Sequence, residues 1–192
     1  PQFMSGLSES HVALGDFNGD EKIDLALVEA VQYDSRTPTS IYIHSGHGDG
    51  TFALRWRTYG SAGAIAAADL DGNGRDELIL ASSSGITRLM ASGDGAADFE
   101  SQGQFIPGFS AVRAMTAADL TGDGFPDLVA AHTNGEISVI RGLGDGGFGA
   151  RQRLVAGTTL QAVAAADLDG DGIVDLAAVR SAQVSSYAYQ GR

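Results

Sequence analysis

The chain has 192 residues, of which 43% are hydrophobic and 19% charged, a balance that indicates a folded globular domain rather than a disordered chain. Its 24 acidic and 12 basic residues give a net charge of -12, which argues against nucleic acid as a partner. It has no cysteine, which excludes disulfides and thiol chemistry, and no apolar run of the roughly 20 residues that a membrane span needs.

The first stretch with a chemical signature covers residues 16–24 (DFNGDEKID). Oxygen-bearing side chains hold its first, third, fifth and ninth positions, namely Asp16, Asn18, Asp20 and Asp24, and Lys22 holds the seventh. Calcium loops use oxygen ligands at such spacings, and the seventh residue contributes its backbone carbonyl. Glycine is expected at the sixth position, where the backbone turns sharply, but this loop has Glu21. The sequence therefore predicts that the loop is strained or turned differently.

Three further stretches repeat the pattern, at residues 69–77 (DLDGNGRDE), 119–127 (DLTGDGFPD) and 167–175 (DLDGDGIVD), and we call the four the first to fourth acidic loops. Their predicted ligands are Asp69, Asp71, Asn73, Arg75 and Glu77; Asp119, Thr121, Asp123, Phe125 and Asp127; and Asp167, Asp169, Asp171, Ile173 and Asp175. Arg75, Phe125 and Ile173 would act through their backbone carbonyls. A single copy could be only a Gly/Asp hairpin turn, but four copies favour about four bound Ca2+ ions.

The acidic loops begin at residues 16, 69, 119 and 167, at intervals of 53, 50 and 48 residues, which is the spacing of a repeated supersecondary unit such as a propeller blade. Each loop lies between an Ala-rich run and an apolar run. Runs this short, bounded by Gly and Asp, predict strands buried on both faces. Each loop is therefore predicted to be a hairpin turn, and the recurring alanines indicate crowded innermost strands.

A second signature follows each of the first three hairpins, at residues 46–52 (GHGDGTF), 93–99 (GDGAADF) and 142–148 (GLGDGGF). With strands on either side of it, each unit has four strands. The DxDGDGxxDL loop and the GDGxF turn together resemble the FG-GAP or VCBS repeat family, which occurs in calcium-binding propellers of integrin alpha subunits and of many secreted bacterial proteins. The resemblance implies an all-β propeller of four-stranded antiparallel blades that binds calcium outside the cell.

The expected organisation is one domain over residues 1–192, with repeats at about 8–60, 61–108, 109–157 and 158–192. Residues 1–7 align with the end of an outermost strand, and the last repeat stops before its GDGxF turn, so residues 1–7 are predicted to complete the last blade. Two arrangements are open: a closed four-bladed monomer, or a head-to-tail homodimer that forms a larger ring.

The expected function is a non-catalytic extracellular recognition module that binds a glycan or another protein. Candidate contacts are Trp56 and Tyr59, near the first GDGxF turn, and the long connection at residues 29–40. No catalytic residue is assigned, because His44, Ser45, His47 and Asp49 lie too close in sequence for triad geometry, and His11 and His132 are expected to be structural. The alternatives are a propeller domain of a secreted polysaccharide-degrading lyase or hydrolase, and a structural spacer.

Overall fold

The computed structural model describes residues 10–29, 40–60, 62–82, 85–92, 99–101, 106–107, 109, 111–155, 157, 159–180 and 183–187. Within these residues every regular element is a β-strand, and no helix is long and apolar enough to cross a membrane. The all-β prediction is therefore confirmed. Residues 30–39 of the predicted recognition connection at 29–40 lie outside the described part, as do residues 1–7.

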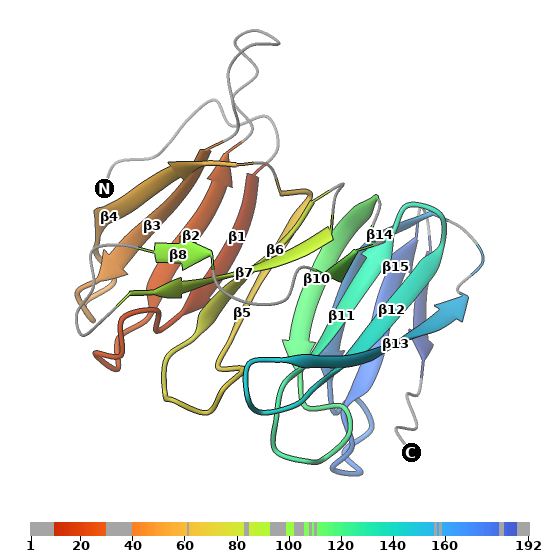
Figure 1. Cartoon of the computed structure of the whole chain (residues 1–192). Helices are drawn as coiled ribbons and strands as arrows, with labels where there is room; N and C mark the ends of the chain where they lie inside the picture. Colours follow the sequence, from red (N-terminus) through yellow and green to blue (C-terminus); the bar gives the residue numbers. More distant parts are fainter. Residues whose placement is uncertain are drawn as a thin grey trace, which may run out of the picture.

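The strands form four antiparallel sheets that follow one another in chain order (Figure 1). The first sheet contains β1 (Ser10–Gly15), β2 (Asp24–Glu29), β3 (Ser40–Gly46) and β4 (Phe52–Tyr59). The second contains β5 (Ala64–Ala68), β6 (Glu77–Ala81), β7 (Gly85–Ala91) and β8 (Phe99–Ser101), and β9 (Ile106–Pro107) also pairs with β7. The third contains β10 (Val112–Ala118), β11 (Asp127–His132), β12 (Glu136–Gly142) and β13 (Phe148–Val155). The fourth contains β14 (Leu160–Ala166), β15 (Asp175–Arg180) and β16 (Gln183–Tyr187).

Each acidic loop is the turn between the first two strands of a sheet, as predicted. The register places the residue before the loop opposite the ninth loop residue in all four hairpins: Gly15 with Asp24, Ala68 with Glu77, Ala118 with Asp127, and Ala166 with Asp175. The second strands of the middle sheets, β6 and β11, are buried along their whole length. The four loops consequently lie along one edge of the molecule, at the lower side of Figure 1.

The hydrophobic core lies between consecutive sheets, because each sheet has apolar residues on the face that meets its neighbour. Phe17, Ile43 and Leu78 belong to the cluster between the first and second sheets. Ile79, Phe109 and Leu128 belong to the next cluster, and Val129, Leu160 and Leu176 to the third. The innermost strands of neighbouring sheets also pack on one another, in the series β1, β5, β10 and β14.

The four sheets form an open row in which the first and fourth sheets are the two ends (Figure 1). At one end, Val12 and Leu14 of β1 are 56% and 58% exposed. At the other end Ala164 of β14 is exposed, whereas Ala66 on the corresponding strand β5 is buried. The described residues therefore do not form the closed four-bladed disc, because β14 does not return to cover β1. Completion of the last sheet by residues 1–7 falls outside the described part.

Candidate metal loops and an inter-sheet cavity

The four acidic loops have the same backbone shape, which is fixed by their first aspartate. One carboxylate oxygen of this residue accepts the N–H of the fourth loop residue, and the other accepts the N–H of the sixth, at 2.7–2.9 Å. The aspartates are Asp16, Asp69, Asp119 and Asp167. The chain can bend around one carboxylate in this way because the fourth and sixth residues have positive φ, from 62° to 89°.

Glu21 adopts the left-handed conformation that glycine has in the other three loops. Its φ is 62°, compared with 82° for Gly74, 89° for Gly124 and 84° for Gly172. The Glu21 N–H still donates to Asp16 at 2.7 Å. The first loop therefore has the common turn with a strained residue in it, rather than a different turn.

The ninth loop residue anchors the loop to the sheet below it. Asp24, Glu77 and Asp127 are buried, and each accepts the N–H of the second residue of its loop, at 3.2, 2.7 and 3.0 Å. Asp175 accepts the N–H of Leu168 at 3.2 Å and is half-buried. Burial raises the pKa of Asp24 and Asp127, because it disfavours the charged form, although the backbone hydrogen bonds oppose this effect.

In the first and third sheets the second oxygen of this carboxylate is held by a glycine of the third strand. Gly46 donates to Asp24 at 2.8 Å, and Gly142 donates to Asp127 at 2.9 Å. A Cβ atom on Gly46 would lie 2.0 Å from the Ile23 carbonyl oxygen. Glycine is thus required for the close approach of the third strand to the loop.

In the second sheet, both the ninth loop residue and the third-strand residue at the position of Gly142 differ from those in the first and third sheets. Ala91 pairs with Phe99 in the register, as Gly142 pairs with Phe148, and the ninth loop residue is Glu77 instead of aspartate. Glu77 Oε1 is buried and accepts no hydrogen bond within the described residues, and its nearest charged partner is Arg88 Nη1 at 3.7 Å. Burial raises the pKa of the Glu77 carboxyl to about 7.

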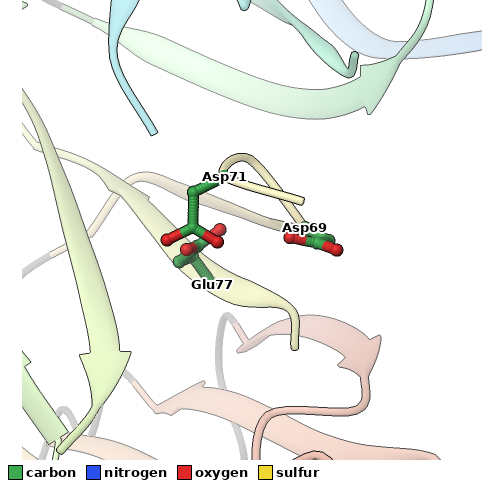
Figure 2. Close-up of side chains that lie close together, drawn as sticks. All are labelled: Asp69, Asp71 and Glu77. Atoms are coloured by element: carbon green, nitrogen blue, oxygen red, sulfur yellow. The ribbon is translucent and has the colours of Figure 1, made fainter. Parts of the chain in front are cut away.

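In each of two acidic loops, the second and the fourth, three carboxylates lie close together. Oxygens of Asp69, Asp71 and Glu77 lie within 4.8 Å of one another. Figure 2 shows the three side chains, with Asp69 to one side of Asp71 and Glu77. Oxygens of Asp167, Asp169 and Asp175 also lie within 4.8 Å of one another in the fourth loop. Hard cations such as Ca2+ prefer a donor set of this kind. The buried Glu77 Oε1 accepts no hydrogen bond within the described residues and lies 3.7 Å from Arg88 Nη1, so a cation there would compete with this ion pair.

The first and third loops do not gather three carboxylates in this way within the described residues. In both, the fifth-position aspartate is paired with a basic side chain: Lys22 Nζ lies 3.5 Å from Asp20, and Arg141 donates to Asp123 at 3.1 and 2.8 Å. The Arg141 hydrogen bonds hold the pKa of Asp123 below its usual range. These basic groups form ion pairs with carboxylates that a bound metal ion would need as ligands.

The remaining predicted ligands range from half-buried to exposed. In each loop the N–H of the seventh residue donates to the side chain of the fifth: Lys22 to Asp20, Arg75 to Asn73, Phe125 to Asp123 and Ile173 to Asp171, at 2.8–3.1 Å. Asn18 donates its amide to Asp24 at 3.2 Å, and Thr121 is half-buried. The seventh side chains Phe125 and Ile173 are 38% and 53% exposed, which fits a residue read through its backbone.

Neighbouring loops are joined by hydrogen bonds that the sequence did not predict. The Asp76 carboxylate accepts the N–H of Asp16 at 2.8 Å, and the Asp76 N–H donates to the Asp16 carbonyl at 2.8 Å. Gly146, in the GDGxF turn of the third sheet, donates to Leu70 at 3.0 Å. The second acidic loop is thus hydrogen-bonded to the first acidic loop on one side and to the GDGxF turn of the third sheet on the other.

A cavity of about 320 Å³ lies between the first and second sheets, away from the acidic loops. Its lining includes Trp56, Thr58 and Tyr59 of β4, and Ser82 and Thr87 from the second sheet. Trp56 packs against Phe99, with ring centroids 5.3 Å apart, whereas Tyr59 is 64% exposed. The two predicted aromatic contacts therefore lie at one cavity, with polar side chains facing them from the next sheet.

The sequence model of the FG-GAP-like repeat matches residues 16–80, 69–130 and 119–178. Each matched segment begins at the first aspartate of one acidic loop and ends within the strand that follows the next loop. The chain belongs to the FG-GAP-like repeat family. The acidic loops and the glycines that hold their ninth carboxylates are thus features of FG-GAP-like repeats in this chain.

No curated protein matches this FG-GAP-like chain. Among solved structures, it is similar to an Agrocybe aegerita lectin with specific recognition of non-reducing terminal N-acetylglucosamine, with a TM-score of 0.64 and 20% sequence identity. The similarity covers 96% of this chain and 51% of the lectin, so the chain spans about half the length of that protein. At this identity the similarity is one of fold.

Proposed function

We propose that this chain is a non-catalytic recognition module that binds glycans outside the cell, on a propeller-type scaffold stabilised by calcium. The observation that carries the proposal is the cavity between the first and second sheets. Its aromatic wall, Trp56 and Tyr59, suits the apolar face of a sugar ring, and Thr58, Ser82 and Thr87 offer hydroxyl groups to the sugar. The similarity in fold to a lectin supports the same class of ligand.

The scaffold proposal treats residues 1–192 as one domain in which the four sheets are four blades. Ca2+ would be held by the second and fourth loops through Asp69, Asp71 and Glu77, and through Asp167, Asp169 and Asp175, with weaker binding in the first and third loops. A bound divalent ion would neutralise carboxylates that otherwise repel one another across each turn. Loop sites of this composition would fill in a calcium-rich extracellular medium.

A glycan array probed in calcium tests the recognition function. We expect the chain to bind selected glycans, and we expect Tyr59→Ala to weaken that binding at least tenfold because it removes an exposed cavity wall. Leu54→Ala is the matched control, since Leu54 is also exposed on β4 but does not line the cavity. Absence of glycan binding, or equal binding by Tyr59→Ala, would contradict the proposal.

Calorimetry in calcium and in EDTA tests the metal. We expect the melting temperature to fall in EDTA, since an ion bound only to the native state contributes about 4 kcal/mol per site at a thousandfold excess over its dissociation constant. Asp167→Ala should lose more stability in calcium than Asp119→Ala, because the fourth loop gathers three carboxylates and the third loop does not. Identical melting curves with and without EDTA would contradict the proposal that calcium stabilises the scaffold.

A further inference from the structure

The first and fourth sheets, at the two ends of the row, each expose apolar side chains. On the fourth sheet, Leu168 is 54% exposed and Val179 is 37% exposed. On the first sheet, Val12, Leu14 and Ile23 are 56%, 58% and 55% exposed. Figure 1 shows these two sheets at opposite ends of the molecule. Each end of the row therefore presents an apolar surface to the solvent.

The exposed residues of the fourth sheet correspond to buried residues of the other three sheets. Leu168 is the second residue of its acidic loop, and this position is at most 2% exposed in the other loops, where it is Phe17, Leu70 and Leu120. Val179 lies four residues after the ninth loop residue, and this position is at most 1% exposed in the other sheets, where it is Val28, Ala81 and Ala131. In those sheets both positions belong to the cluster shared with the sheet that follows. The fourth sheet thus has the side-chain pattern of a face that packs on a following sheet.

The first sheet has the complementary pattern. Val12 lies four residues before its loop, and the counterparts Ile65 and Met115 are buried in the clusters shared with the preceding sheet. Ile23 is the eighth residue of its loop, a position that contacts the preceding sheet elsewhere in the molecule: Asp76 is hydrogen-bonded to the first loop, and Val174 packs in the cluster between the third and fourth sheets. The exposed face of the first sheet therefore matches the faces that pack on a preceding sheet.

The exposed loop residues at the two ends hold positions that pack together inside the row. Leu120, the second residue of the third loop, and Val174, the eighth residue of the fourth loop, belong to one cluster between the third and fourth sheets. Leu168 and Ile23 hold these same two positions at the two ends. An apolar contact between Leu168 of one copy and Ile23 of another would reproduce the contact between Leu120 and Val174.

The exposed strand residues show the same relation. Ala81 and Met115 belong to one cluster between the second and third sheets. Val179 holds the position of Ala81 on the fourth sheet, and Val12 holds the position of Met115 on the first. The two ends are thus the two halves of the contact that joins consecutive sheets three times within the molecule.

We propose that the fourth sheet of one copy of this chain packs on the first sheet of a second copy, and that two copies close into one ring through two such contacts. Each copy has one end of each kind, so the contact is head to tail, and a two-fold axis makes the two contacts identical. Two copies of four sheets give eight, the upper end of the roughly four to eight blades of propellers. The contact removes the exposed apolar side chains of both ends from water. It joins face to face, and is separate from the predicted completion of the last sheet by residues 1–7.

Sedimentation velocity of the whole chain in calcium, at several protein concentrations, tests the proposal. We expect the wild type to be a dimer. Val12→Lys alters the first-sheet end and Val179→Lys the fourth-sheet end, and each should raise the dimer dissociation constant about tenfold or more, because it buries an unpaired charge in both contacts. Leu143→Lys is the matched control, since Leu143 is 49% exposed between β12 and β13 of the third sheet and belongs to neither end.

Mixing the two variants tests whether unlike ends meet. The fourth-sheet end of the Val12→Lys chain and the first-sheet end of the Val179→Lys chain are both unaltered, so these two ends can form one intact contact. We therefore expect a heterodimer that is tighter than the dimer of either variant alone. Native mass spectrometry with one variant isotopically labelled identifies it, and the melting temperature of each variant shows whether it is folded.

Several results would overturn the proposal. A wild type that stays monomeric at every concentration, or open polymers that grow with concentration, would each exclude the closed pair. Weakening by only one of the two end variants, or a mixture no tighter than its components, would show that like ends meet. Loss of the dimer in Leu143→Lys would place the contact elsewhere. The glycan function proposed above is measured separately, because neither Val12 nor Val179 lines the cavity at Trp56.

Discussion

The second and third sheets hold the ninth-position carboxylate of their acidic loops with different pairs of residues. In the third sheet Asp127 faces Gly142, and backbone N–H groups occupy both carboxylate oxygens. In the second sheet the acid is Glu77 and the counterpart of Gly142 is Ala91, and one Glu77 oxygen has no hydrogen bond within the described residues. The shorter acid thus occurs with glycine and the longer acid with alanine, so the length of the acid and the bulk of the residue at the Gly142 position are coupled. The Asp–Gly pair satisfies both carboxylate oxygens through backbone N–H groups, whereas Glu77 Oε1 has an ion pair with Arg88 Nη1 at 3.7 Å and no hydrogen bond within the described residues.

The largest expected effect is that of Gly142→Ala. The added Cβ would lie 2.2 Å from the Pro126 carbonyl oxygen and would push the strand away from Asp127. Overpacking and the lost hydrogen bond to a buried carboxylate together predict a loss of about 3 kcal/mol or more in the unfolding free energy. Urea denaturation at fixed calcium measures this loss.

Two further variants sharpen the test of Gly142. Ala91→Gly, the reverse change in the second sheet, should alter stability by about 1 kcal/mol or less. A double variant, Gly142→Ala with Asp127→Glu, reproduces the second-sheet pair and should recover part of the loss. If it is less stable than Gly142→Ala alone, the proposed coupling between acid length and facing residue is wrong.

The second effect concerns pH in the metal-free protein. Burial raises the pKa of Glu77 from 4.5 to about 7, so the folded protein favours the protonated carboxyl. Its contribution to stability is complete below about pH 4.5 and is lost as the pH rises through about 7, a change of about 3 kcal/mol. Glu77→Gln should remove this contribution, which chemical denaturation in EDTA at several pH values would measure. A difference between variant and wild type that does not change with pH would contradict this assignment.

Calcium binding provides a second test of the raised pKa of Glu77. A metal ion favours the ionised carboxylate, so binding at the second loop should release a proton below about pH 7 and should tighten as the pH rises. Calorimetry in buffers of different ionisation enthalpy detects the released proton. The fourth loop is the internal control, because Asp167→Ala should leave this proton release intact.

A smaller effect is expected at Arg141, which occupies Asp123 in the third loop. Arg141→Gln should strengthen calcium binding at this loop roughly fivefold, or about 1 kcal/mol, since the competing ion pair is exposed. Titration of calcium into both proteins measures the change. Arg153→Gln makes the same change in charge away from the loop and should have no effect.

The smallest effect is that of Glu21→Gly. Removing a non-glycine residue from the left-handed conformation should stabilise the first loop by somewhat less than about 1 kcal/mol, because glycine has more freedom to lose on folding. The reverse change in the fourth loop, Gly172→Glu, should destabilise by a similar amount. Thermal unfolding of both variants measures this, and a stabilising Gly172→Glu would show that φ does not control these turns.

The sequence by itself determined the all-β class, the position of every acidic loop between two strands, and the family. These features depend on local chemistry: alternating turns and short apolar runs fix the strands, and the first aspartate of each loop binds backbone N–H groups three and five residues away. The residue expected to be strained, Glu21, was also identified correctly, since the fourth and sixth loop positions both have positive φ and Glu21 is the one residue at these positions that is not glycine.

Only the tertiary structure decided which carboxylates gather and which are already paired. Arg141 is 18 residues from Asp123 along the chain, and Gly46 is 22 residues from Asp24, so no local pattern connects them. The same holds for a cavity at the innermost strands, in which His11, expected to be structural, lies with Arg113 and Gln161 from other sheets. Ring closure likewise depends on how the sheets pack on one another. The sequence pattern of a single strand does not specify this packing, because the packing results from many contacts between sheets.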